Sequence, residues 1–341
     1  MIEIYSPTIR RKEMDAVLTA LVEDKIGPGE RSEMLIQNAK EYLGFDYCIA
    51  VRSPAIALYI ALKALAIEDG KEVIVSALSP VYYIHIIEAL RLTPVFCDTA
   101  PSCAVIDKEH IQTLLSPRTQ AIVLRHTLGF TPDTASIAEL GLPVIEDCSQ
   151  SFGTRADGDA LLPSAGVFTL IGLEERDMLT AGGGALLFAM NRRNGTALRN
   201  LGTLPDEYAL PDMNAAMAIV QLREAHRNRA KVKEIANAYA QASLRTRHKR
   251  FISRDGVEYN DYTFPLILES GMKDVKAYAK KKDIAVENPF GNTALGSGHV
   301  AGREQCPESY SLSMRTVIFP LYPRLTGADI EKVVKLIGTL P

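Results

Sequence analysis

A polar insert separates two apolar runs within residues 166–188, GVFTLIGLEERDMLTAGGGALLF. The insert begins at Glu174, whose carboxylate could transfer a proton as a general acid or base. Imine chemistry would instead require the neutral amine of a lysine, and no lysine lies between Lys108 and Lys231. Arg176 cannot replace it, because a guanidinium group stays protonated near neutral pH. The segment therefore has a group for proton transfer but none for covalent amine chemistry.

A second candidate group follows a short apolar run, where Asp147 and Gln150 stand in the sequence VIEDCSQ. An aspartate after a buried strand often does no more than open a loop. In a parallel sheet, however, the carboxyl ends of the strands form the edge at which ligands bind. We therefore expect the side chain of Asp147 to point into an internal cleft.

The composition argues against several classes of function. The 341 residues are 47% hydrophobic and 23% charged, as in ordinary globular proteins, and a net charge of −3 offers no basic field to nucleic acid. No apolar run approaches the roughly 20 residues of a membrane helix, and the first residues lack the apolar core of a signal peptide. The five cysteines form no CxxC pair and the six histidines no HExxH pattern. We expect a cytoplasmic protein with reduced thiols and no metal site.

The first two-thirds of the chain alternates strand and helix patterns. The expected strands are continuous apolar runs, which indicates burial on both faces of a parallel sheet. Strands and helices that alternate in this order predict a large, doubly wound α/β domain. We expect strands over 47–53, 71–77, 93–99, 119–127 and 142–150, and helices over 31–44, 54–67, 81–92 and 133–141.

A long helical pattern over 212–243 leads into a different unit. Its second half is strongly charged, as expected for a helix that leaves the core. We therefore predict a large domain over 1–235 and a small C-terminal α/β domain over 236–341. In the small domain we expect strands over 262–268, 284–289 and 313–323, and helices over 272–283 and 326–340, the last capped by Thr326.

Several stretches, in the same order and spacing, resemble the DegT/StrS-type sugar aminotransferases across almost the whole chain. They are residues 26–65, 71–99, 104–133 and 142–154, with VIFPLYPRLTGADIEKVV at 317–334 similar to the C-terminal signature of that family. The resemblance implies the type I fold of pyridoxal phosphate (PLP) transferases, with a large mixed or parallel sheet. It also implies action on nucleotide-linked keto-sugars by homodimers whose active sites lie between subunits.

The resemblance assigns roles to individual positions. Asp147 stands where the family pairs a carboxylate with the pyridinium nitrogen of PLP, and Gln150 where a residue touches the ring hydroxyl side. Thr169 matches the serine of an F-S-F-x-x-x-K pattern, and Glu174 stands at the position of its Schiff-base lysine.

Other family positions are altered together. The family carries Ser/Asn-Gly-Thr at the phosphate, and this chain has Ser53-Pro54-Ala55, which lacks the threonine hydroxyl and one backbone donor. Pro80 takes the place of the stacking aromatic, and we expect the neighbouring Tyr82 and Tyr83 to lie in the following helix. Glu207 stands where a partner-subunit asparagine binds the phosphate in the family.

These losses favour a non-catalytic or repurposed homologue without covalent PLP, which binds a nucleotide-sugar or pairs with an active paralogue. One alternative is an active aminotransferase or dehydratase that holds PLP or PMP (pyridoxamine phosphate) without a covalent link and uses Glu174 as its base. A further alternative is an ordinary aminotransferase with a lysine from the region between Lys231 and Lys282. We expect a homodimer in each case.

Overall fold

Seven strands form one large sheet in the computed structural model, which describes residues 1–156, 160–161, 165–202 and 204–341. Strand β9 is antiparallel to both of its neighbours, β1 and β8, and the other pairings are parallel. In spatial order the strands are β1 (Tyr47–Val51), β9 (Ala185–Ala189), β8 (Phe168–Gly172), β5 (Val144–Asp147), β4 (Thr119–Arg125), β2 (Glu72–Ser76) and β3 (Thr93–Cys97).

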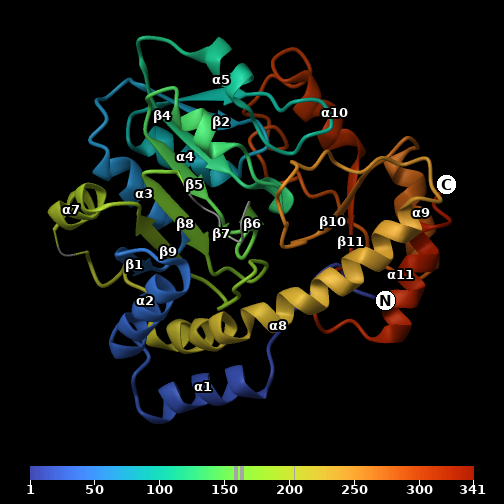
Figure 1. Cartoon of the computed structure of the whole chain (residues 1–341), viewed down its shortest axis with the longest axis horizontal. Helices are drawn as coiled ribbons and strands as arrows, with labels where there is room; N and C mark the ends of the chain where they lie inside the picture. The colour runs from blue at the N-terminus through green and yellow to red at the C-terminus, as the bar shows by residue number, and fades with distance from the viewer. Residues whose placement is uncertain (157–159, 162–164, 203) are drawn as a thin grey trace.

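Both faces of the large sheet are buried, as the continuous apolar runs predict. In β4, Ala121 and Val123 pack into the core beneath α3 and α4, while Ile122 and Leu124 pack into a separate cluster on the opposite face. The helices of the large domain therefore form a layer on each side of the sheet (Figure 1). They are α2 (Glu30–Leu43), α3 (Pro54–Ala64), α4 (Val81–Ala89), α5 (Lys108–Leu114), α6 (Thr134–Ala138) and α7 (Arg192–Asn200), with a 3-10 turn η1 (Thr127–Gly129). Helix α1 (Arg11–Val22) packs instead against α8 (Asp212–Ser243), outside these layers.

The long helix α8 (Asp212–Ser243) connects two hydrophobic clusters. Its first half packs with α2 against the large sheet, and Val232, Ile235 and Tyr239 in its second half pack into a C-terminal cluster. Figure 1 shows α8 running from below the large sheet to the small unit. The other elements are β6 (Arg155–Ala156), β7 (Ala160–Leu161), β10 (Phe264–Ile267), α9 (Met272–Lys281), α10 (Pro307–Arg315), β11 (Thr316–Phe319) and α11 (Gly327–Ile337).

Most expected elements are present, but the strand predicted over 284–289 was wrong. Ile284 pairs only with Ile2, and Glu287 only with Ile318, as isolated bridges. The segment therefore crosses between two different neighbours and does not run alongside either. Its continuation reaches the large domain, since Pro80 forms a bridge with Thr293.

Thr326 caps α11 as the sequence predicts. Its hydroxyl accepts a hydrogen bond from the N–H of Asp329, whose carboxylate in turn accepts from the N–H of Thr326. Within the described part of the chain, no helix combines the length and apolar character needed to cross a membrane. The predicted division at residue 235 falls inside the continuous helix α8 and stays a prediction.

Candidate functional site at the carboxyl edge of the large sheet

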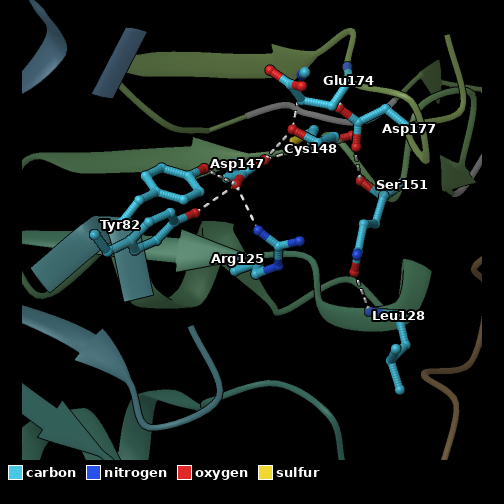
Figure 2. Close-up of polar contacts among 12 residues, drawn as sticks. Tyr82, Arg125, Leu128, Asp147, Cys148, Ser151, Glu174 and Asp177 are labelled. Carbon is cyan, nitrogen blue, oxygen red and sulfur yellow. Dashed lines mark hydrogen bonds and ion pairs between the residues drawn. The ribbon is translucent and has the colours of Figure 1, made fainter. Parts of the chain in front are cut away.

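Asp147 ends β5 and lies buried at the carboxyl edge of the sheet, where only 2% of its surface is exposed. Its Oδ2 accepts three hydrogen bonds, from the Tyr83 hydroxyl at 2.6 Å, Nη1 of Arg125 at 3.1 Å and the Tyr82 hydroxyl at 3.3 Å. Its Oδ1 accepts from the backbone N–H of Ser149 at 3.0 Å and from the Ser149 hydroxyl. Figure 2 shows Tyr82 and Arg125 pointing at this one carboxylate. Both oxygens are therefore engaged by groups of the same chain.

Strand register and helix position explain this convergence. Arg125 is the last residue of β4 and stands directly opposite Asp147 in the parallel pairing with β5. The two tyrosines lie in the first turn of α4, which begins immediately after Pro80. The sequence predicted their place in this helix, but it gave no sign that the first turn faces the sheet edge.

Burial and charge fix the ionisation of these partners. Burial raises the pKa of Tyr82 and Tyr83 well above the ordinary value, and the nearby Asp147 charge raises it further, so both phenols stay protonated donors. Burial lowers the pKa of Arg125, but Asp147 and the neighbouring tyrosines together raise it more, and the net shift is upward. Arg125 and Asp147 form a buried ion pair.

The predicted neighbour Gln150 lies on the same edge but makes a structural contact. Its Oε1 accepts a hydrogen bond from the backbone N–H of Leu128 at 2.7 Å. Ser149 links Asp147 to the next strand, because its Oγ accepts from the N–H of Gly172 at 2.8 Å. These bonds hold the loop after β5 in place.

The polar insert forms a tight turn in which Asp177, and not Glu174, folds back toward the sheet. The N–H of Glu174 donates to Oδ2 of Asp177 at 2.9 Å, and a Cβ at Gly172 would collide with the same oxygen. Burial raises the pKa of Asp177 to about 7, although the N–H of Glu174 opposes the shift. The Glu174 side chain is exposed, and partial desolvation raises its pKa. Asp177 is therefore the carboxylate that titrates near neutral pH.

The start of α3 acts as a helix cap. The Ser53 hydroxyl accepts from the N–H of Ile56 at 3.3 Å, and Pro54 occupies the first helical position. Ala55 follows without a polar side chain. Thr169 lies buried in β8, and its hydroxyl has no hydrogen-bond partner among the described residues. Of these residues only Pro54 lines the cleft described next.

A cleft of about 380 Å³ lies beside Asp147. One wall comes from the edge of the large sheet, and the other from residues 287–293 and Ile318. An ion pair between Arg176 and Glu287 connects the walls at 3.0 Å. The polar residues that line the cleft are Tyr82, Arg125, Thr127, Ser149, Gln150, Glu174, Arg176, Asp177, Tyr262, Glu287, Asn288, Asn292 and Thr293.

A buried group of His126, Glu146 and Cys148 brings three metal-ligating atoms within 4.8 Å of one another. Both imidazole nitrogens already have partners, Ser151 Oγ at 2.7 Å and Glu146 Oε2 at 3.2 Å. The Cys148 sulfur lies 3.7 Å from each nitrogen, and burial raises its pKa well above the ordinary value. These contacts favour a hydrogen-bonded structural cluster with a protonated thiol.

Comparison with known proteins identifies the family. The model of the DegT/DnrJ/EryC1/StrS aminotransferase family matches residues 7–338. The chain belongs to this family. Its α/β architecture, with a mostly parallel seven-stranded sheet, is that of the type I PLP-transferase structures.

Solved aminotransferase structures share the fold at low identity. The aminotransferase TlmJ from Streptoalloteichus hindustanus is 23% identical, with a TM-score of 0.90 over 99% of this chain and 98% of that one. The PLP form of the putative sugar aminotransferase Spr1654 from Streptococcus pneumoniae is 16% identical, with a TM-score of 0.89 over 97% and 96%. DesV from S. venezuelae, solved with a ketimine intermediate, is 19% identical, with a TM-score of 0.87 over 96% and 93%.

Arg125 and Asp177 were missed in the sequence. Arg125 ends the apolar run AIVLR, where a charged residue at a strand end is the only signal. Asp177 has no signal of its own in the sequence, because the family pattern aligns its lysine with Glu174, three residues earlier. Only the turn geometry distinguishes the carboxylate that faces inward.

Proposed function

We propose that this chain is a non-catalytic or repurposed member of its family that binds a nucleotide-linked sugar without PLP, in sugar or surface-polysaccharide biosynthesis. The observation that carries the proposal is the occupation of Asp147. In the family this aspartate pairs with the ring nitrogen of PLP and keeps the ring an electron sink. Here its oxygens accept hydrogen bonds from Tyr82, Tyr83, Arg125 and Ser149. No acceptor position is left for the ring.

The covalent link to PLP has no candidate amine. Glu174 stands at the family lysine position, and its side chain is exposed at the cleft. Among the described residues that line the cleft there is no lysine. An imine therefore has no partner within reach of this site.

The phosphate position is also unsuited to PLP. The hydroxyl of Ser53 serves as the cap of α3, Pro54 has no N–H, and Ala55 has no hydroxyl. Each hydrogen bond lost to a charged group weakens binding by about 1.5–3 kcal/mol. The residues present therefore do not fit PLP, at either the ring nitrogen or the phosphate.

The cleft itself suits a sugar. The amides of Gln150 and Asn292 can bind sugar hydroxyls, whereas the side chains of Asn288 and Thr293 already hydrogen-bond to the backbone. Solved relatives in fold include the sugar aminotransferase CalS13 from Micromonospora echinospora, 20% identical with a TM-score of 0.86. The family membership and the polar lining together favour a nucleotide-sugar ligand over an unrelated one.

The same proposal includes a homodimer, or a pair with an active paralogue. Met14, Leu18 and Val22 on α1 are 57%, 57% and 75% exposed, with Ile26 and Met34 exposed nearby. Contiguous exposed apolar side chains of this kind mark protein interfaces. Light scattering at micromolar concentration should give twice the monomer mass of 37.3 kDa, and a monomer would contradict the homodimer.

One observation favours the alternative of an enzyme that holds PLP or PMP without a covalent link. Asp177 lines the cleft with a pKa of about 7, which suits a general base at neutral pH. If the alternative holds, we expect Asp177, not Glu174, to transfer the proton.

Dialysis against excess PLP, followed by borohydride reduction and peptide mass spectrometry, tests the proposal. We expect no stoichiometric pyridoxyl-lysine and no PLP retained after washing. A single fully modified lysine would contradict the proposal and favour an ordinary aminotransferase that binds PLP covalently. If PLP stays bound after washing and no lysine is modified, the result would favour an enzyme that holds PLP without a covalent link.

A further inference from the structure

Arg125 occupies a position with direct access to Asp147. It is the last residue of β4, and its register partner on β5 is Asp147 itself. The Nη1–Oδ2 distance is 3.1 Å, and the Arg125 side chain is 14% exposed, at the cleft. The guanidinium group therefore lies between the carboxylate and the space that a ligand would enter.

The carboxylate has little capacity left for another donor. An ionised carboxylate offers about four acceptor sites on its two oxygens. Ser149 uses Oδ1 through its N–H and its hydroxyl, and Tyr83, Arg125 and Tyr82 share Oδ2. A further N–H donor would have to displace one of these groups, and Arg125 is held to Asp147 by an ion pair as well as by a hydrogen bond.

Charge distinguishes Arg125 from the other partners of Asp147. The tyrosines and Ser149 are neutral donors, whereas Arg125 already supplies the positive charge that balances Asp147. Attraction by Asp147 raises the pKa of Arg125, so the guanidinium cannot release its proton to accommodate a second cation. A pyridinium ring at Asp147 would lie beside a fixed like charge in a buried site.

We propose that Arg125 excludes pyridinium cofactors from Asp147, and that this exclusion is independent of the missing lysine. The inference rests on the proposed function, in which the chain works without PLP. The positive charge of Arg125 is then the main barrier to a cofactor ring at Asp147. The altered phosphate position at Ser53–Ala55 then lowers the affinity for the cofactor to a smaller extent.

PMP is the probe because its binding needs no lysine. The effect of Arg125 can therefore be measured apart from that of the missing lysine. Arg125→Gln removes the charge but keeps a donor for Asp147, and Arg125→Lys is the matched control that keeps the charge. Arg125→Ala is a second neutral variant that empties the position. Equilibrium dialysis with PMP fluorescence gives the Kd of each, and far-UV circular dichroism checks the fold.

We expect Arg125→Gln and Arg125→Ala to bind PMP about tenfold or more tightly than the wild type and Arg125→Lys. Folded neutral variants that bind no better than Arg125→Lys would overturn the inference and leave the proposed function intact. An equal gain in Arg125→Lys would also overturn it, because the charge would not be the barrier. Tight PMP binding by the wild type would overturn both this inference and the proposed function.

Discussion

The Asp147 network and the Glu174–Asp177 turn face the same cleft, yet they differ in chemical availability. The Asp147 carboxylate is buried, paired with a cation and fully hydrogen-bonded. Asp177 accepts from the N–H of Glu174, and its pKa of about 7 leaves it free to titrate. One part of a ligand site can thus be closed while another part, on the same side of the cleft, keeps a reactive group. Three substitutions measure this difference and a fourth, at Ser53, tests the cap of α3; they follow in order of decreasing effect.

Asp147→Ala should destabilise the protein most, by about 3–5 kcal/mol, because it leaves Arg125 as an unpaired buried charge. It also removes the acceptor of the buried Tyr83 hydroxyl and of the partly buried Tyr82 hydroxyl. Denaturant unfolding followed by circular dichroism measures the free energy of unfolding. A loss below about 1 kcal/mol would mean that the contacts of Asp147 contribute little to the stability of the fold.

Asp177→Asn should change the pH dependence of stability. The unfolded chain ionises Asp177 near its ordinary value of 3.8, whereas the folded protein holds the proton to about pH 7. Between these values the folded state binds more protons, so this group lowers the free energy of unfolding as the pH rises. The substitution should therefore stabilise the protein at pH 8 by on the order of 2 kcal/mol, with little effect at pH 3.

The control for Asp177→Asn is the wild-type protein, measured at the same pH values. Unfolding curves at pH 3, 5, 7 and 8 give the difference between the two proteins directly. Parallel stability curves for the two proteins would show that Asp177 does not carry a raised pKa.

Ser53→Ala should cost about 1 kcal/mol, the usual effect of losing a helix cap. Ser53→Asp keeps an oxygen acceptor for the N–H of Ile56 and should retain most of the stability. Thermal unfolding compares the three proteins. Equal stability of the alanine and aspartate variants would argue against a capping role.

Glu174→Gln should change the free energy of unfolding by less than about 0.5 kcal/mol, because the side chain is exposed. The same denaturant titration as for Asp147→Ala gives the value. An effect comparable to that of Asp147→Ala would place both carboxylates in one cooperative network and remove the contrast between the two regions.

The sequence predicted the large sheet and helix α8 because their signals are local. Continuous apolar runs marked the buried strands, and helical periodicity over 212–243 matches the bounds of α8. The strand expected over 284–289 failed because its apolar residues contact two different partners, Ile2 and Ile318. Such pairing depends on distant chain segments, which periodicity cannot report. The helices α1, α5, α7 and α10 were not predicted.

The site was predicted in part. The sequence indicated Asp147 at the end of a buried strand, because that position depends only on one apolar run. Its partners come from other elements, with Arg125 twenty-two residues away and Tyr83 sixty-four residues away along the chain. Their convergence depends on strand register and on the direction of the first turn of α4. Neither quantity can be read from residue types alone.

The pairing of Arg125 with Asp147 also bears on how the sheet aligns as it folds. The two residues are direct register partners on adjacent parallel strands. A slip of β4 by one residue would turn Arg125 to the opposite face, which Ile122 and Leu124 now occupy. Asp147 would then be buried without a counter-charge, at a high cost in free energy. The contact that closes the cleft to a cofactor therefore also penalises the nearest misaligned sheets.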